Sequence, residues 1–126
     1  MNRLLLLLLM LSGEAQAVFL TGNDLLLECE AGEGRGNLTF MPFGVCSGYI
    51  KSVTDTLQVL VESGELEPRF CLSTGITGVT GSQLKKTVFQ YLKKHPTELH
   101  YAAAGLVLSA LKENFPCAQH RPAGTP

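Results

Sequence analysis

The sequence predicts an all-α protein: a small four-helix bundle clipped by two disulfides, which follows a cleaved signal peptide. Apolar residues recur every three or four positions in several stretches, as on one face of a helix, and no stretch alternates as a strand does. Four cysteines, an even number in a short chain, are typical of a disulfide framework. The length of 126 residues fits one domain. A net charge of −1 excludes electrostatic anchoring on nucleic acid.

The start of the chain predicts a signal peptide that is cleaved between Ala17 and Val18. A basic start is followed by an unbroken apolar run over residues 4–11 and by small residues before the cut. A membrane anchor is the alternative, but eight apolar residues rise only about 12 Å as a helix, against a hydrocarbon core of about 30 Å. We therefore expect a mature form without a membrane span, soluble outside the cytoplasm. The predicted domains are residues 1–17 (signal peptide), 18–117 (helical domain) and 118–126 (flexible C-terminal tail).

Two helices are predicted in the first half of the mature chain. The first covers residues 23–30, with Asn23 or Asp24 as its N-cap. Residues 33–44, which are rich in glycine, predict a loop. The second helix has an apolar stripe and ends at Gly64. The residues of this stripe are Cys46, Tyr49, Ile50, Val53, Leu57, Leu60 and Val61.

Two further helices are predicted in the second half. Thr80 and Gln83 form a capping-box pattern that begins the third helix. His95-Pro96 is a corner, because a proline is tolerated at the first helical position and disfavours helix in the residue before it. The fourth helix then runs from Pro96 to just before Pro116. The third helix carries a basic outer edge, made of Lys85, Lys86, Lys93 and Lys94.

The expected topology predicts how the cysteines pair. A short corner makes the third and fourth helices an antiparallel hairpin, which brings Cys71, ahead of the hairpin, close to Cys117, after it. Cys29 ends the first helix and Cys46 opens the second, so these two form the other disulfide. A zinc site is the weaker alternative, because no C-x-x-C pair is present. We predict Cys29–Cys46 and Cys71–Cys117, and no metal.

No convergent catalytic set can be assembled from the sequence. Asp55 falls opposite the apolar stripe of its helix, as a solvated surface acid does. His95 and His100 are five residues apart, which is poor spacing for joint ligation on a helix. The Thr-Gly repeat over residues 74–81 lacks the lysine that follows in a phosphate loop, so it predicts a flexible loop. These absences predict a binding protein rather than an enzyme, with no cofactor.

Several segments, in order, resemble the Rap/Tai immunity proteins of bacterial type VI secretion. The longest is the run from Cys46 to Asp55, which is similar to a C-x-G-Y-I-x-G-V-x-D stretch of that family. The resemblance covers about residues 20–117. This chain differs from the family pattern at Ser52, where a second glycine is common, and in a longer loop before Thr80. The other matching segments are Phe70-Cys71-Leu72, Val79-Thr80 with Gln83-Leu84, Tyr91 to Pro96, Ala103, Leu106-Val107, Ala110-Leu111 and Phe115-Pro116-Cys117.

The resemblance implies a periplasmic, all-helical protein that binds a peptidoglycan-cleaving amidase effector and blocks its active site. Such proteins are often dimers, so a homodimer is a further expectation. We place the contact surface at exposed turns, with Thr77, Thr80, Lys93, Lys94, His95, Thr97 and Glu98 as predicted partner-binding residues. The alternative function is a periplasmic chaperone-like protein of unknown client, outside any toxin pair, that loosens at low pH. The low share of charged residues, 17%, argues mildly against such an acid trigger.

Overall fold

The computed structural model describes residues 19–33, 40–72 and 78–117, and these form four α-helices and one short 3-10 helix. Within these ranges there is no strand, and an isolated bridge pairs Thr21 with Ala102. The predicted all-α class and the four helices are confirmed. The predicted signal peptide and C-terminal tail lie outside the described residues. The elements are α2 (Gly22–Ala31), α3 (Phe40–Glu62), α4 (Gly81–Lys94), η1 (Pro96–Glu98) and α5 (Ala103–Asn114).

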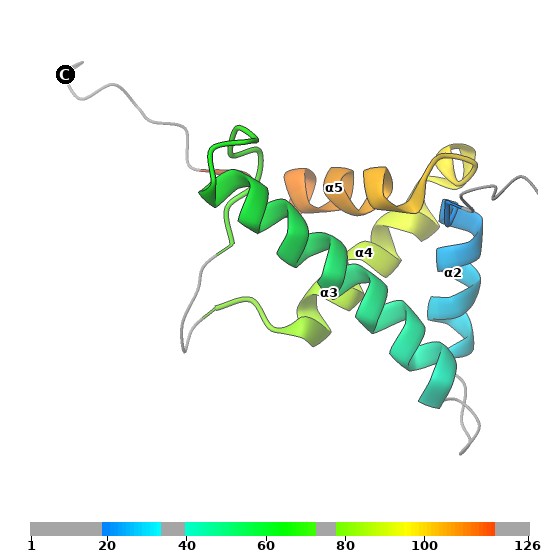
Figure 1. Cartoon of the computed structure of the whole chain (residues 1–126). Helices are drawn as coiled ribbons and strands as arrows, with labels where there is room; N and C mark the ends of the chain where they lie inside the picture. Colours follow the sequence, from blue (N-terminus) through cyan, green and yellow to red (C-terminus); the bar gives the residue numbers. More distant parts are fainter. Residues whose placement is uncertain (1–18, 34–39, 73–77, 118–126) are drawn as a thin grey trace, which may run out of the picture.

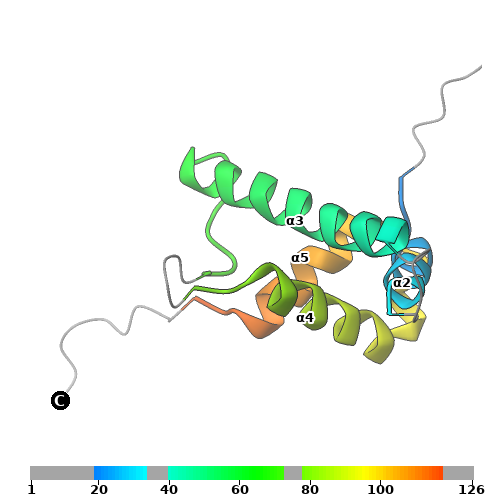
Figure 2. The same ribbon diagram turned by 90° about the horizontal axis from the view of Figure 1, so that it is seen from below.

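The long helix α3 contacts each of the other three α-helices. In Figure 1 it crosses in front of α4, while α5 lies along the top of the molecule and α2 stands at its right side. Figure 2 shows α3 on one side of the molecule, α4 on the other and α2 at one end. All four α-helices therefore enclose one common core.

The core is apolar and takes residues from every α-helix. The stripe predicted on α3 is confirmed at Cys46 and Ile50, which are buried, and Thr54 is buried beside them. The Thr54 hydroxyl donates to the carbonyl oxygen of Ile50 at 2.7 Å, so burial of this polar group is compensated within the helix. The buried apolar residues are Leu25, Cys29, Cys46, Ile50, Phe70, Leu84, Val88, Tyr91, Leu92, Leu99, Ala103, Leu106, Val107, Ala110 and Leu111.

Capping boxes begin both α2 and α4. At α4 the predicted box is confirmed: the Gln83 amide N–H donates to the Thr80 hydroxyl at 3.2 Å, and the Gln83 side chain accepts from the Thr80 N–H at 2.7 Å. At α2 the prediction of Asn23 or Asp24 as N-cap is wrong. The N-cap is Thr21, and Asp24 is its partner at the third helical position. An aspartate can accept the N-cap N–H just as a glutamate or glutamine does, so Asp24 completes the box from inside the helix.

The helix α3 begins earlier than the sequence predicted. The expected loop over residues 33–44 is wrong from Phe40 onward, because residues 40–44 are helical. Pro42 lies in the first turn of this helix. The first four N–H groups of a helix have no partner within it, so a proline there removes no helical hydrogen bond.

The fourth helix begins later than predicted, at Ala103 instead of Pro96. Residues 96–98 form only the 3-10 turn η1. The Asn23 N–H donates to the Leu99 carbonyl at 2.9 Å, and the Gly22 N–H donates to the Tyr101 carbonyl at 2.9 Å. These carbonyls accept from the first two residues of α2, and these bonds replace the ones that a continuous helix would make.

Both predicted disulfides are present. Cys29 and Cys46 join the end of α2 to α3 with a Cα–Cα distance of 5.0 Å. Cys71 and Cys117 are joined at a Cα–Cα distance of 4.8 Å, and the Cys71 N–H also donates to the Phe115 carbonyl at 2.8 Å. The first disulfide is buried, whereas Cys71 is exposed. The chain before α4 is thereby fixed to the chain after α5, as the hairpin argument required.

Candidate functional site

A groove of about 920 Å³ lies between α3 and α4. The α4 side extends over almost the whole helix, and α3 contributes Ser47 and Lys51. A methyl group on Gly81 would come within 2.8 Å of the Lys51 Cε atom, so Lys51 reaches from α3 to the start of α4. The lining residues are Glu33, Ser47, Lys51, Thr80, Gly81, Ser82, Lys85, Lys86, Phe89, Gln90, Lys93 and Lys94.

The periodicity of α4 makes this groove basic. The apolar residues of the helix turn toward the core, and Leu84, Val88 and Leu92 are buried. A second face of α4 is formed by residues spaced three or four positions apart, namely Lys86, Phe89, Gln90 and Lys93. This face lines the groove. Five lysines and one carboxylate therefore line the groove among the described residues.

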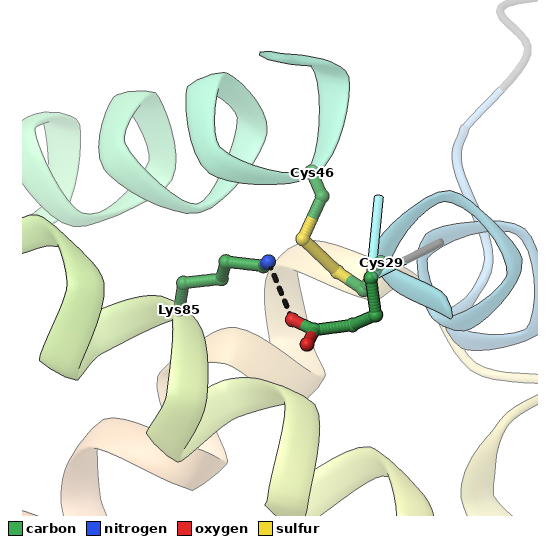
Figure 3. Close-up of polar contacts among 4 residues, drawn as sticks. Cys29, Cys46 and Lys85 are labelled. Atoms are coloured by element: carbon green, nitrogen blue, oxygen red, sulfur yellow. Dashed lines mark hydrogen bonds and ion pairs between the residues drawn. A yellow bond between two sulfur atoms is a disulfide. The ribbon is translucent and has the colours of Figure 1, made fainter. Parts of the chain in front are cut away.

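The carboxylate of the groove is held by an ion pair. The Lys85 Nζ lies 2.7 Å from the Glu33 Oε1, with 10% of the lysine side chain and 58% of the glutamate side chain exposed. In Figure 3 the Lys85 side chain extends from α4 toward the disulfide between Cys29 and Cys46, and a dashed line marks the ion pair. The hydrogen bond and the charge of Lys85 lower the pKa of the Glu33 carboxyl. The ion pair thus fastens the segment after α2 to α4.

This pair predicts a pH-dependent contribution to stability. Because the pKa of Glu33 in the folded protein lies below its ordinary value of 4.5, its contribution is complete above about pH 4.5 and disappears as the pH falls through the folded pKa. We expect Glu33→Gln to be less stable than the wild type at pH 7, and the difference to vanish in acid. Urea unfolding at about pH 7, 4.5 and 3 measures this. The exposed Glu65→Gln is the control, and a difference for Glu33→Gln that did not shrink between pH 7 and pH 3 would contradict the charge explanation.

An aromatic ring lies midway along the groove. Phe89 is half-buried, and the Lys93 Nζ lies 5.2 Å from the centroid of its ring. The charge of Lys93 also contributes to the lowered pKa of Glu33. The groove therefore offers an apolar surface with cations around it.

The structure brings together three of the predicted partner-binding residues. Thr80, Lys93 and Lys94 all line the groove and are exposed. Thr97 is exposed but lies at the η1 turn, outside the lining. Thr77 lies outside the described residues. Whether any of these residues touches a partner stays a prediction.

His95 and Glu98 have contacts within the corner itself. The His95 ring stacks on Tyr91 with centroids 4.0 Å apart, and its Nδ1 lies 2.8 Å from the Tyr91 carbonyl oxygen. The Tyr91 hydroxyl donates to the Glu98 Oε2 at 3.2 Å. Burial raises the pKa of Tyr91, so this hydroxyl stays protonated and able to donate at neutral pH. Both side chains thus hold the turn between α4 and η1.

Sequence reasoning missed the groove residues that α4 does not supply. Lys51 and Glu33 approach α4 only through the packing of α3 and of the segment after α2, and no local spacing connects them with it. The α4 side did have a signal, since its lysines were predicted as a basic outer edge. That prediction is wrong for Lys85, which is buried and forms the ion pair with Glu33. The half-buried Phe89 among them was the residue that could have indicated a surface for binding.

In the described part of the chain, no group of three or more His, Cys, Asp or Glu side chains could hold a metal ion. No helix there is long and apolar enough to cross a bilayer.

Comparisons with known proteins add one match. Searches of curated proteins and of solved structures gave no match. The family model of the Rap1a immunity proteins matches residues 21–117, which include every described helix and all four cysteines. The chain therefore belongs to the family of Rap1a immunity proteins.

Proposed function

We propose that this protein is a periplasmic immunity protein that binds a peptidoglycan-cleaving amidase effector of type VI secretion and blocks its active site. The family match over residues 21–117 carries this proposal, because it indicates an immunity protein for a secreted effector. Two disulfides fit an exported protein, since they persist in oxidising compartments such as the periplasm. Residues 1–17 would direct that export, and 118–126 would form a flexible tail.

The fold suits inhibition by steric occlusion. Disulfides join α2 to α3 and fix the chain before α4 to the chain after α5, so the exposed surface is presented without large rearrangement. A pre-organised surface loses less entropy on binding, and burial of about 800 Å² on each partner is enough for a stable complex. Such a mechanism uses no cofactor and no reactive group of this chain. The exposed turns at Thr80 and at residues 93–98 are the proposed contacts, and a homodimer could present two such surfaces.

An inhibition assay with a purified amidase tests the proposal. The mature chain, residues 18–126 with both disulfides intact, is mixed with a candidate amidase effector, and loss of turbidity of a peptidoglycan suspension is followed. We expect stoichiometric inhibition and a complex that elutes as one species. Lysozyme, which cleaves the glycan strand, is the control and should keep its activity. Full amidase activity in a tenfold excess of the immunity protein would contradict the proposal.

A second assay tests where the protein acts. Cells that export the amidase to the periplasm are expected to survive when the full chain is co-expressed. A variant that lacks residues 2–17 should not protect them, because it would remain in the cytoplasm with reduced cysteines. Equal protection by the two forms would contradict the periplasmic site of action.

A further inference from the structure

We infer that the basic groove between α3 and α4 binds an extended acidic segment of the effector protein. This inference rests on the proposed function and deepens it, because it names the surface and the chemistry of the contact. Of the predicted contact residues, Thr80, Lys93 and Lys94 line this groove.

The charge of the protein surface is uneven. The whole chain carries a net charge of −1, yet Lys51, Lys86, Lys93 and Lys94 are exposed along one groove. Across the described ranges no carboxylate lies within ion-pair distance of these four ammonium groups. Concentrated charge of one sign in a hollow attracts a ligand of the opposite sign. A partner segment with several carboxylates carries the negative charge that such a groove attracts.

The groove already holds a carboxylate of this chain. Glu33 is the one acidic residue among the described lining residues, and its carboxylate lies 2.7 Å from the Lys85 ammonium. Lys93 adds a further attraction that helps to lower the pKa of this carboxyl. The site therefore stabilises a negative charge in the folded protein, and the aspartates or glutamates of a partner would enter the same field.

The length of the groove fits an extended peptide. The lining runs along α4 from Thr80 to Lys94, and at 1.5 Å per residue this distance is about 20 Å. An extended peptide of about six residues has that length. Phe89 lies near the middle and offers an apolar contact between the cations. An acidic segment that alternates with apolar side chains fits this groove.

A protein segment suits the groove better than the other anions of the cell envelope. Stem peptides of peptidoglycan also carry carboxylates, but the family of this chain acts on a protein effector. Nucleic acid would need a dense basic surface over the whole fold, which a chain of net charge −1 does not have. Peptidoglycan fragments are therefore an outcome of the test.

The test uses a fluorescein-labelled hexapeptide that alternates aspartate with leucine, and the same peptide with asparagine in place of aspartate. Fluorescence anisotropy of each with the oxidised mature protein measures affinity at low and high salt. We expect the aspartate peptide to bind at least about tenfold more tightly, and to lose affinity as salt screens the charges. Equal affinity for the two peptides would overturn the inference.

Charge reversals locate the site. Lys51→Glu and Lys86→Glu, on opposite sides of the groove, are each expected to weaken binding of the aspartate peptide about tenfold. Lys112→Glu makes the same charge change at an exposed position of α5 outside the groove and should stay within about twofold of the wild type. Glu33→Gln should strengthen binding, since it removes the carboxylate that competes for the cations. Groove reversals no more harmful than Lys112→Glu would overturn the inference.

Two comparisons separate this inference from the proposed function. If the groove reversals inhibit the amidase as strongly as the wild type does, the groove inference is wrong while the proposed function stands. If the wild type binds a labelled peptidoglycan stem peptide in the groove more tightly than the aspartate peptide, the protein occupant is wrong. Failure of the wild type to bind any amidase, in contrast, refutes the proposed function. Thermal unfolding of each variant confirms that the fold is intact.

Discussion

Replacing Cys29 and Cys46 together by alanine is expected to lower the free energy of unfolding by about 4 kcal/mol. The disulfide closes a loop between two cysteines that are 17 residues apart. Loss of this constraint on the unfolded chain accounts for about 3 kcal/mol of the expected destabilisation. Both cysteines are fully buried, so removal of their sulfur atoms also leaves a cavity between α2 and α3 that adds about 1 kcal/mol. A domain of this size has only about 5–15 kcal/mol in total.

Urea unfolding of the oxidised proteins measures this difference. Ser47→Ala, at the residue after Cys46, is the control and should change stability by less than about 0.5 kcal/mol. A loss below about 1 kcal/mol in the double variant would contradict the prediction, because the cross-link would then constrain the unfolded chain very little. In the groove, the same variant should loosen the segment that carries Glu33 and so reduce the pH dependence described above.

Gly22→Ala is expected to cost about 2–3 kcal/mol, because no space exists for a methyl group at this position. The added Cβ would collide with the Leu106 Cδ1 atom and would lie 3.0 Å from both the Cα atom and the carbonyl oxygen of Leu99. The leucine side chain can rotate, but the backbone of Leu99 cannot move without breaking its hydrogen bond from the Asn23 N–H. The substitution therefore separates the start of α2 from the turn before α5.

The matched control is Gly48→Ala, in the interior of α3. A methyl group there meets no atom within 4 Å, so the change should stabilise the protein by about 0.5–1 kcal/mol through helix propensity alone. Thermal unfolding should move the midpoints of the two variants in opposite directions. A Gly22→Ala variant as stable as the wild type would mean that the two segments are not in close contact in solution.

Much of this fold follows from local interactions, and several of these were predicted correctly. The box of Thr80 and Gln83 begins α4, because its hydrogen bonds connect residues only three positions apart. Gly64 follows the end of α3 with a φ of 78°, a left-handed conformation that glycine adopts without strain. The cysteine pairs could be predicted because a hairpin of two helices brings the chain before it and the chain after it to one end.

The start of α5 was predicted wrongly because distant segments share hydrogen bonds there. Nothing near Pro96 in the sequence shows that the carbonyls of Leu99 and Tyr101 accept from the first residues of α2, and those bonds delay the start of α5. For the same reason, only the α4 side of the groove could be predicted from the sequence. The lysines of α4 follow a local spacing, whereas Lys51 and Glu33 join them through packing of other elements.

The amino-acid sequence alone thus determined the helical class, the pairing of the cysteines and the basic edge of one helix, because each depends on periodicity or on neighbours along the chain. Only the tertiary structure decided where α5 begins and that α3 and the segment after α2 complete a groove with that basic edge. The physical reason is that contacts between remote segments depend on how whole helices pack, and the sequence carries no local signal for that packing.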